Sequence, residues 1–409
     1  MKTQKHYFSC INCGTEFHNV DFMYLCPHCA KDNSVNMPPK GVLKTYYDYD
    51  KIKNQYGNRL KDEISPLFLP LLPIENADSF GSLMQGETPL LKSNQENQTF
   101  ELFLKDDSRM PTFSFKDRAS FLVSAWAKEQ GIETIITAST GNAGSSLAGI
   151  CASQKQKAII CVPQNAPKAK MTQILMYGAR IIPVAGTYDD AFDLSVALTE
   201  KYGVFNRNTA YNPFTIEGKK SIAFELFRQM NFYTPDRIFV SCGDGVIISG
   251  VYKGFEDLLK VGLIDKIPHI VAVQAEGSNN IVRNLHADKH TFKTSKTIAD
   301  SISVDLPRNF YMSLDFLKTY KGQGVEVSDD EILKASKSLS SENGVFSEPA
   351  AAAAYAGLLK QSAAKKIADS EKVVVLLSGS GLKDINAVQS EIKIPEAINS
   401  TEFLEDFKF

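Results

Sequence analysis

The sequence predicts an α/β protein with doubly wound, mostly parallel sheets in one or two lobes, preceded by a small cysteine-rich module. Three observations predict this class. From Ile135 onward, short β-branched runs alternate with longer helical patterns. These runs are apolar throughout, which is typical of parallel strands buried on both faces. Four of the seven cysteines stand apart from this pattern, within the first thirty residues.

The amino-terminal cysteines form two CxxC units with twelve residues between them. Two such turns can bring four thiolates onto one tetrahedral zinc ion. In a reducing cytosol, a cluster of four thiols favours a metal site over two disulfides. Four cysteines leave no open coordination position, so we expect structural Zn²⁺ in a ribbon over residues 1–35. The expected ligands are Cys10, Cys13, Cys26 and Cys29.

Residues 36–109 are predicted to connect the ribbon to the main body and to begin that body, because most of this stretch lacks sustained periodicity. A proline followed by alanines predicts a helix over residues 349–361 that packs closely on a sheet. The chain after Asp384 is expected to be an extended segment docked on the body. The predicted strands lie in the runs 134–139, 157–163, 179–186, 236–243, 269–277 and 372–381.

Composition and charge exclude several classes of function. The chain has 45 Lys+Arg against 47 Asp+Glu and a net charge of −2, which argues against a nucleic-acid or acidic-membrane binder. No apolar run approaches the roughly 18 residues that span a bilayer, and the first residues lack the apolar core of a secretory signal. We therefore expect a cytoplasmic protein of two or three folding units, with no membrane or nucleic-acid partner.

Lys116 is the candidate catalytic residue. It lies between a Ser/Thr-rich turn and a helical run, close to Phe113 and Phe115. Desolvation beside these rings lowers a lysine pKa and favours the neutral amine that a Schiff base requires.

Three small-residue turns follow predicted strands, at residues 139–143, at 243–247 and at Ser378. Each of the first two opens a helix, where backbone amides can bind an anion. The carboxyl ends of parallel strands meet at one edge of a sheet, so these turns and Lys116 predict one crevice for a phosphorylated cofactor and a carboxylate.

Six motifs share an order and spacing that resemble the threonine synthase family of fold-type II pyridoxal-phosphate enzymes, over roughly residues 70–385. The resemblance implies two α/β lobes, the smaller over residues 110–215 and the larger over 216–409 with the carboxyl-terminal segment. It also suggests a homodimer. The motifs are TPLL at Thr88, PTFSFKDR around Lys116, STGNAGSS at Ser139, NPFTIEGKKS at Asn212, CGDGVIISG at Cys242 and SGSGLKD at Ser378.

The resemblance also implies roles for individual residues. Lys116 would bind pyridoxal 5′-phosphate covalently and move protons, Asn142 would contact the phenolic oxygen of the cofactor, and Ser378 would meet its pyridine nitrogen. The cofactor's phosphate would lie on Gly243, Asp244, Gly245, Val246 and Ile247. The substrate's α-carboxylate would lie on Ser139, Thr140 and Gly141.

Departures from the family pattern concern the substrate. Members that use O-phosphohomoserine usually have arginine where this chain has Thr215, and asparagine where it has Asp244. Losing a guanidinium removes a strong phosphate contact, and an ionised carboxylate repels an anion. Phe113 in place of glycine is expected to narrow the pocket. The missing cation could come from Lys219, Lys220 or Arg118.

Two enzyme functions and one other function remain open. The family default converts O-phosphohomoserine to threonine and phosphate. The alternative enzyme performs β-elimination or β-replacement on O-phosphoserine or a related serine-like substrate, as cysteate synthase does. The third possibility is a non-catalytic zinc-ribbon adaptor, which the presence of Lys116, Asn142 and Ser378 disfavours. We therefore expect a lyase or synthase that acts on a small, phosphorylated amino acid.

Overall fold

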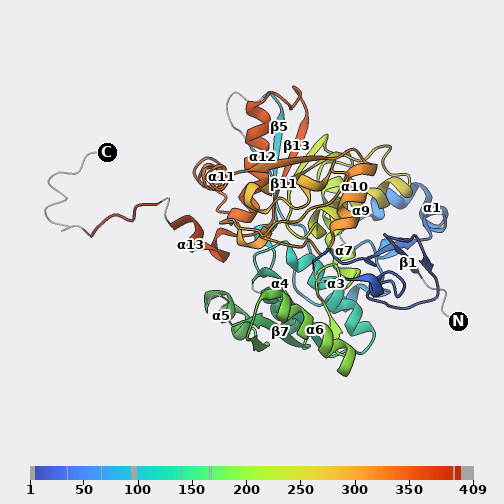
Figure 1. Ribbon diagram of the computed structural model, residues 1–409. Helices are drawn as coiled ribbons and strands as arrows, with labels where there is room; N and C mark the ends of the chain where they lie inside the picture. Colours follow the sequence, from blue (N-terminus) through green and yellow to red (C-terminus); the bar gives the residue numbers. More distant parts are fainter. Residues whose placement is uncertain are drawn as a thin grey trace, which may run out of the picture.

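The computed structural model describes residues 5–34, 36–65, 67–93, 99–139, 141–164, 166, 168–389 and 392–397. Two α/β lobes lie one above the other in Figure 1, and a small amino-terminal sheet lies at the side of both. Each lobe is built on its own sheet, of four and six strands. The two-lobed α/β prediction is therefore confirmed.

The amino-terminal module is a three-stranded antiparallel sheet in the order β2-β1-β3. Its strands are β1 (His6–Cys10), β2 (Glu16–Phe17) and β3 (Leu43–Tyr47), so it takes its last strand from the predicted connector. Short helices α1 (Tyr49–Tyr56) and α2 (Leu60–Glu63) follow.

The smaller lobe is a parallel sheet in the order β8-β7-β6-β9. Apolar side chains of α3, α4 and α5 join one face of this sheet in a single core, and those of α6 cover the other face. This is the doubly wound arrangement that apolar strands predict. The elements are β6 (Thr134–Ala138), β7 (Lys157–Pro163), β8 (Arg180–Val184), β9 (Phe205–Asn206), α3 (Lys116–Glu129), α4 (Asn142–Ser153), α5 (Lys168–Met176) and α6 (Tyr188–Tyr202).

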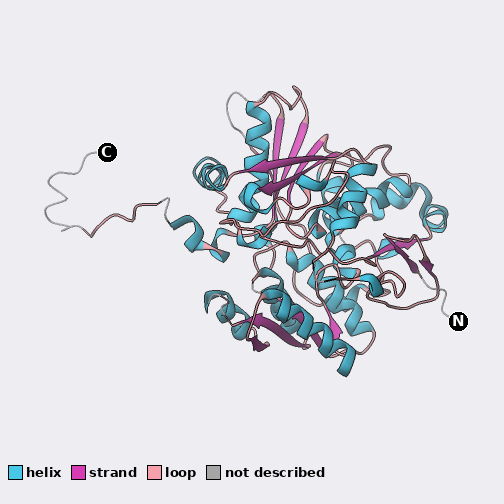
Figure 2. Ribbon diagram, in the orientation of Figure 1, coloured by secondary structure: helices cyan, strands magenta, loops and turns pink. Residues whose placement is uncertain are grey.

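The larger lobe is a six-stranded sheet in the order β12-β11-β10-β13-β5-β4, parallel except for β4. Two of these strands, β4 and β5, come from the predicted connector. The sheet lies between helices on both faces (Figure 2). The strands are β4 (Leu90–Lys92), β5 (Glu101–Asp106), β10 (Arg237–Ser241), β11 (His269–Ala275), β12 (Gln323–Val327) and β13 (Lys372–Leu377).

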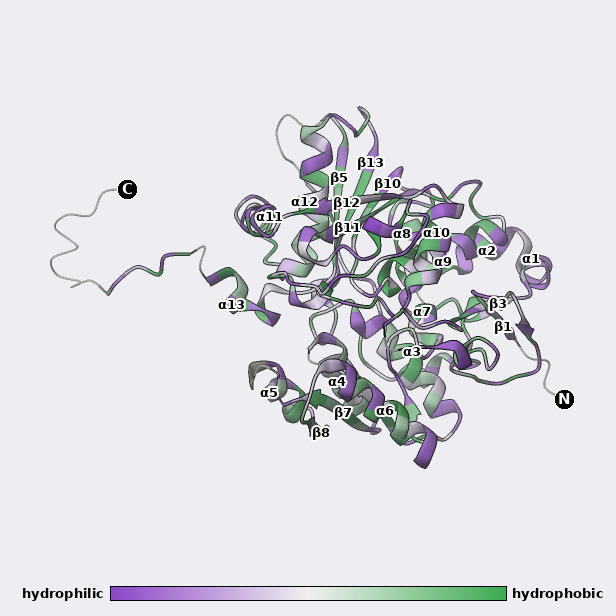
Figure 3. Ribbon diagram, in the orientation of Figure 1, coloured by the Kyte–Doolittle hydropathy of each residue, from purple (hydrophilic) through white to green (hydrophobic). Residues whose placement is uncertain are grey.

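The helices of the larger lobe divide between the two faces of its sheet. Side chains of α11 and α12 pack on one face, and those of α8, α9 and α10 pack on the other. The apolar middle portions of strands β10 and β13 are coloured as hydrophobic in Figure 3. The helices are α7 (Phe214–Lys219), α8 (Ser221–Gln229), α9 (Val246–Lys260), α10 (Phe310–Thr319), α11 (Asp329–Asn343) and α12 (Pro349–Ala363). The last of these confirms the alanine-rich helix.

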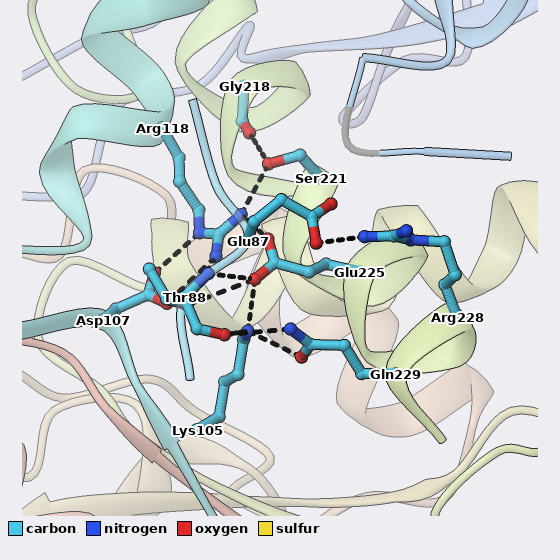
Figure 4. A network of polar contacts seen from close by, with 10 residues as sticks. All are labelled: Glu87, Thr88, Lys105, Asp107, Arg118, Gly218, Ser221, Glu225, Arg228 and Gln229. Carbon is cyan, nitrogen blue, oxygen red and sulfur yellow. Dashed lines mark hydrogen bonds and ion pairs between the residues drawn. The ribbon is translucent and has the colours of Figure 1, made fainter. Parts of the chain in front are cut away.

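A buried ion network joins β5, α3 and α8 (Figure 4). Arg118 donates to both carboxylate oxygens of Asp107, at 2.6 and 2.9 Å, and lies 2.9 Å from Glu225. Lys105 forms a second ion pair with Glu225. The side chains of all four residues are fully buried. Because these charges neutralise one another, the network links strand and helices without leaving a free charge in the core.

The chain ends in a short helix, α13 (Ile385–Val388), followed by an exposed segment over residues 392–397. Ile392 and Ile394 are 60% and 71% exposed, and the segment leads away from the lobes in Figure 1. The predicted docking of this segment on the body is therefore wrong for residues 392–397. No helix in the described parts of the chain combines the length and apolar character needed to cross a membrane.

Candidate active site

A cavity of about 470 Å³ lies between the two lobes. The smaller lobe contributes the turn before α4 and the start of α6, and the larger lobe contributes the turn before α9 and the loop that precedes α10. Such a volume suits a small-molecule site. The residues predicted from sequence that line it are Lys116, Ser139, Gly141, Asn142, Gly243, Asp244, Gly245, Val246 and Ile247.

Lys116 is the first residue of α3, and its Nζ has no hydrogen-bond or ion-pair partner among the described residues. Burial lowers its pKa, the charge of Glu348 opposes that effect, and Arg207 lowers the pKa further. The preceding residue, Phe115, donates its amide to the carbonyl of Ser378 at 2.9 Å. The residue after β13 therefore holds the turn that carries Lys116. The lowered pKa of Lys116 favours its neutral amine.

Arg207 lies directly behind Lys116 and was not predicted from the sequence. Its guanidinium is fully buried and donates to Ser120 Oγ at 3.2 Å, to Thr209 Oγ1 at 3.1 Å and to the Lys116 carbonyl at 3.4 Å. No carboxylate pairs with it in the described regions, and burial lowers its pKa to about 10. No local motif marks this residue, because its role depends on residues about ninety positions away.

Asn142 contacts a second residue that sequence reasoning missed. Its Nδ2 donates to the Glu348 carboxylate at 2.9 and 3.2 Å and to Ser301 Oγ at 3.2 Å. Glu348 is 1% exposed at the start of α12, and a Cβ at Gly379 would approach its Oε1 to 2.4 Å. Glycine at that position therefore makes room for the carboxylate that orients Asn142. The only sequence signal was a glutamate before the proline that opens the predicted helix.

The turn over residues 243–247 can receive an anion. α9 begins after Gly245, which adopts a left-handed φ of 82° and provides no side chain to cap the helix. A Cβ at Gly243 would come within 2.9 Å of Ile302 Cα. The first amides of a 15-residue helix therefore face the cavity uncapped, as phosphate binding requires.

The turn before α4 provides a second uncapped helix start. Gly141 is its N-cap residue and donates its amide to Ser139 Oγ at 3.1 Å. Both line the cavity. Thr140, predicted beside them, lies outside the described residues.

Two predicted residues do not line the cavity. Thr215 is fully buried and donates to the Asn212 carbonyl at 2.7 Å. Ser378 is 1% exposed at the end of β13. Phe113 is also absent from the lining and is 45% exposed, so the predicted narrowing of the pocket is wrong.

Charged residues from both lobes meet at the mouth of the cavity. The Asp244 carboxylate accepts the amide of Arg308 at 3.2 Å, and burial raises the pKa of Asp244. The Arg308 side chain forms an ion pair with Asp189 at the start of α6. Lys170 of α5 pairs with Asp300 in the loop before α10. These two contacts hold that loop against the smaller lobe.

The four predicted zinc ligands converge in the amino-terminal module. Their sulfur atoms all lie within 4.8 Å of one another, and all four thiols are free of disulfides. The sulfurs of Cys13 and Cys26 are 3.8 Å apart. Tetrahedral zinc with Zn–S bonds of about 2.3 Å places its sulfurs about 3.8 Å apart, so this cluster has the dimensions of a metal site.

Comparisons with known proteins agree with this geometry. A family model described as pyridoxal-phosphate dependent enzyme matches residues 81–379. The threonine synthase of Methanocaldococcus jannaschii is 35% identical over 399 residues, covering 94% of this chain and 96% of that protein. The threonine synthase of Halalkalibacterium halodurans is 34% identical, covering 80% of this chain and 91% of that protein.

Solved structures share the fold at lower identity. The processed form of threonine deaminase isoform 2 from Solanum lycopersicum has a TM-score of 0.66 and 22% identity, covering 77% of this chain and 90% of its own. Maize serine racemase has a TM-score of 0.64 and 23% identity, covering 75% and 93%. These similarities support the two-lobed α/β fold and leave the reaction open.

Proposed function

This chain belongs to the threonine synthase family of pyridoxal-phosphate-dependent enzymes, and from that membership we propose that it converts O-phosphohomoserine to threonine and phosphate. One observation carries the proposal: an unpaired lysine and an uncapped, glycine-rich helix start line the same cavity. The presence of both features in one cavity fits a lyase or synthase. A non-catalytic adaptor needs neither feature.

The residues present fit pyridoxal phosphate. Lys116 offers an unpaired amine for covalent attachment, and the amides at the start of α9 suit the phosphate group. Asn142, oriented by Glu348, would donate to the phenolic oxygen. The Ser378 hydroxyl would meet the pyridine nitrogen. When bound, this cofactor withdraws electrons from the substrate's Cα.

Proton movement would depend on the chain's own residues. With the cofactor and substrate bound, the Lys116 Nζ would take the proton from the substrate's Cα as a neutral amine and would return protons later. Ser139 and Gly141, beside the start of α4, would hold the α-carboxylate. A serine hydroxyl at the ring nitrogen moderates electron withdrawal compared with a carboxylate, which favours elimination and replacement over transamination.

A specific observation supports the second candidate, elimination or replacement on O-phosphoserine or a related substrate. Thr215 is turned into the protein by its bond to Asn212, and the carboxyl group of Asp244 lines the cavity. Both features remove phosphate contacts expected of a typical member of the family.

The test compares two substrates. We expect the enzyme to release phosphate from O-phosphohomoserine and form threonine, and Lys116→Ala to abolish both the reaction and the visible absorbance of the lysine-bound cofactor. Phosphate release from O-phosphoserine alone would establish the second candidate. Wild-type protein without cofactor absorbance would contradict both enzyme functions.

We also propose that the four amino-terminal cysteines bind a structural zinc ion. The distances among their sulfur atoms support this proposal. Four cysteines also fill all four positions of a tetrahedral zinc ion, which is typical of a structural site. The cluster lies in the small module, outside the cavity lining.

A further inference from the structure

The phosphate of the proposed substrate needs a cation that Thr215 does not supply. Two of the three cations that could replace it are already neutralised. Arg118 is paired with Asp107 and Glu225 in the network of Figure 4. Lys220 lies 2.5 Å from Glu217 and 2.7 Å from Asp257. Neither can turn to an incoming anion without leaving buried carboxylates unpaired.

Lys219 differs from both. Its side chain is 1% exposed and lines the cavity, yet no hydrogen bond or ion pair engages its Nζ within the described part of the chain. An unpaired buried amine is costly unless a ligand completes its environment. Burial lowers its pKa well below the ordinary value, Arg207 and Lys116 lower it further, and Asp244 opposes them.

The backbone places Lys219 beside the phosphate-binding turn. Lys219 is the last residue of α7, which packs on α9. A Cβ at Gly250 would lie 2.6 Å from Lys219 Cβ, so the glycine allows Lys219 to pack closely against α9. Gly250 lies one turn after the uncapped start of that helix. The free amine and the free helix amides therefore face one cavity from adjoining elements.

The surroundings favour a compact, doubly charged anion. Lys116 lines the cavity together with Lys219, and Arg207 lies behind Lys116. Neither Lys116 nor Arg207 has a carboxylate partner among the described residues, and the Asp244 carboxylate in the same lining only partly offsets the basic charge around Lys219. A phosphate dianion would favour the charged form of Lys219 and gain a charge-assisted hydrogen bond. An uncharged or cationic group would leave the Lys219 amine without a charged partner.

We propose that Lys219 binds a phosphate monoester in the cavity and so takes the place of the cation missing at Thr215. This inference rests on the proposed function, because the phosphate belongs either to the substrate's leaving group or to the cofactor. Both sources offer the same chemistry, and binding measurements separate them.

The first measurement is calorimetric titration of the cofactor-loaded enzyme with inorganic phosphate. We expect Lys219→Met to weaken phosphate binding by at least about tenfold, as loss of a hydrogen bond to a charged group implies. Lys219→Arg should retain most of the affinity. Lys128→Met removes an exposed lysine of α3 and serves as the matched control.

The second measurement compares the affinities of the apoenzyme for pyridoxal phosphate and for pyridoxal. If Lys219→Met lowers only the preference for the phosphorylated form, the bound phosphate is the cofactor's. If it weakens only inorganic phosphate binding, the site receives the leaving group. If neither quantity changes, the proposal is overturned.

A wild-type measurement keeps the proposal testable if the variants do not fold. Sulfate does not titrate near neutral pH, so its binding to the loaded enzyme should draw protons from the buffer onto Lys219. Sulfate binding without proton uptake, or no binding of sulfate by either the loaded enzyme or the apoenzyme, would contradict the proposal. Failure of the proposed function has a different signature, namely no phosphate release from either phosphorylated substrate by the wild-type enzyme.

Discussion

At the scale of single residues, three basic side chains in or beside the cavity lack carboxylate partners among the described residues. Lys116 and Lys219 line it, and Arg207 lies behind Lys116, held by hydroxyl and carbonyl oxygens. Burial lowers the pKa of all three. The charge of Arg207 lowers the pKa of both lysines further, which favours a neutral lysine nucleophile at Lys116 and an anionic ligand at Lys219.

Glu348 should control the pKa of Lys116. Its charge opposes the lowering by burial, so Glu348→Gln should lower that pKa further. Cofactor attachment needs the neutral amine, and the pH midpoint for cofactor uptake by the apoenzyme should therefore move to lower pH. Glu75→Gln, at an exposed side chain, is the control. A midpoint that stays in place or rises would show that Glu348 acts only through Asn142.

Phe113 should be a site of backbone strain. It adopts a φ of 69°, in the left-handed region that favours glycine, while its ring is 45% exposed. Phe113→Gly should raise the free energy of unfolding by about 0.5–1 kcal/mol, after allowing for the greater freedom of glycine in the unfolded chain. Phe113→Ala loses the same ring but keeps its Cβ, so it is the matched control. Urea denaturation that finds alanine as stable as glycine would exclude strain.

At the scale of elements, the amino-terminal module is attached to the larger body of the protein beside α7. Tyr47 of β3 donates to Glu217 of α7 at 2.5 Å, and the ring centroids of Phe22 and Trp126 are 5.0 Å apart. α7 ends at Lys219, so the amino-terminal module contacts the helix that carries this residue.

Removing the proposed zinc should therefore be visible at Trp126. This is the single tryptophan of the chain, and it is 7% exposed beneath Phe22. Loss of zinc removes on the order of 10 kcal/mol of binding energy from the ribbon. Chelation or Cys29→Ser should shift tryptophan fluorescence to the red, with Cys151→Ala as the control. A protein that holds zinc and loses it without any change in emission would contradict this coupling.

At the scale of the whole molecule, buried ion pairs join segments far apart in the sequence. Glu225 of α8 pairs with Lys105 of β5 and Arg118 of α3, and Asp257 of α9 pairs with Lys220, the residue between α7 and α8. Burial alone would raise the pKa of Glu225, but Arg118 and Lys105 outweigh it and lower the pKa from 4.5 to about 2. Lys220 and Lys253 likewise lower the pKa of Asp257 to about 2.

These carboxylates should set the acid limit of stability. Because the folded-state pKa is depressed, their contribution is complete above the unfolded value of about 4.5 and is lost as the pH falls toward 2. Glu225→Gln should cost about 3–5 kcal/mol at pH 7, because it leaves buried cations unpaired. The variant's free energy of unfolding should also fall less than that of the wild type between about pH 4.5 and pH 2.

Urea unfolding at several pH values measures both effects. Glu200→Gln, at an exposed residue of α6, provides the control for losing one carboxylate. A variant that retained the wild-type pH slope would assign the acid sensitivity to other groups.

The sequence by itself determined the features that depend on local pattern. Continuous apolar runs predicted six strands, and β6, β7, β8, β10, β11 and β13 lie in them. Four cysteines in two CxxC units predicted the cluster that the structure brings together. The glycine turns were found because small residues between a strand and a helix are themselves a sequence signal. Lys116 was found from its position beside Phe113 and Phe115 and from the motif around it.

Only the tertiary structure decided which side chains face the cavity and in which charge state. Asn142 and Glu348 are 206 residues apart, and Arg207 reaches Lys116 across 91 residues. The motif NPFTIEGKKS contains both Lys219 and Lys220, yet Lys220 meets carboxylates and Lys219 meets none among the described residues. Desolvation and pairing depend on neighbours distant along the chain, which no local pattern specifies.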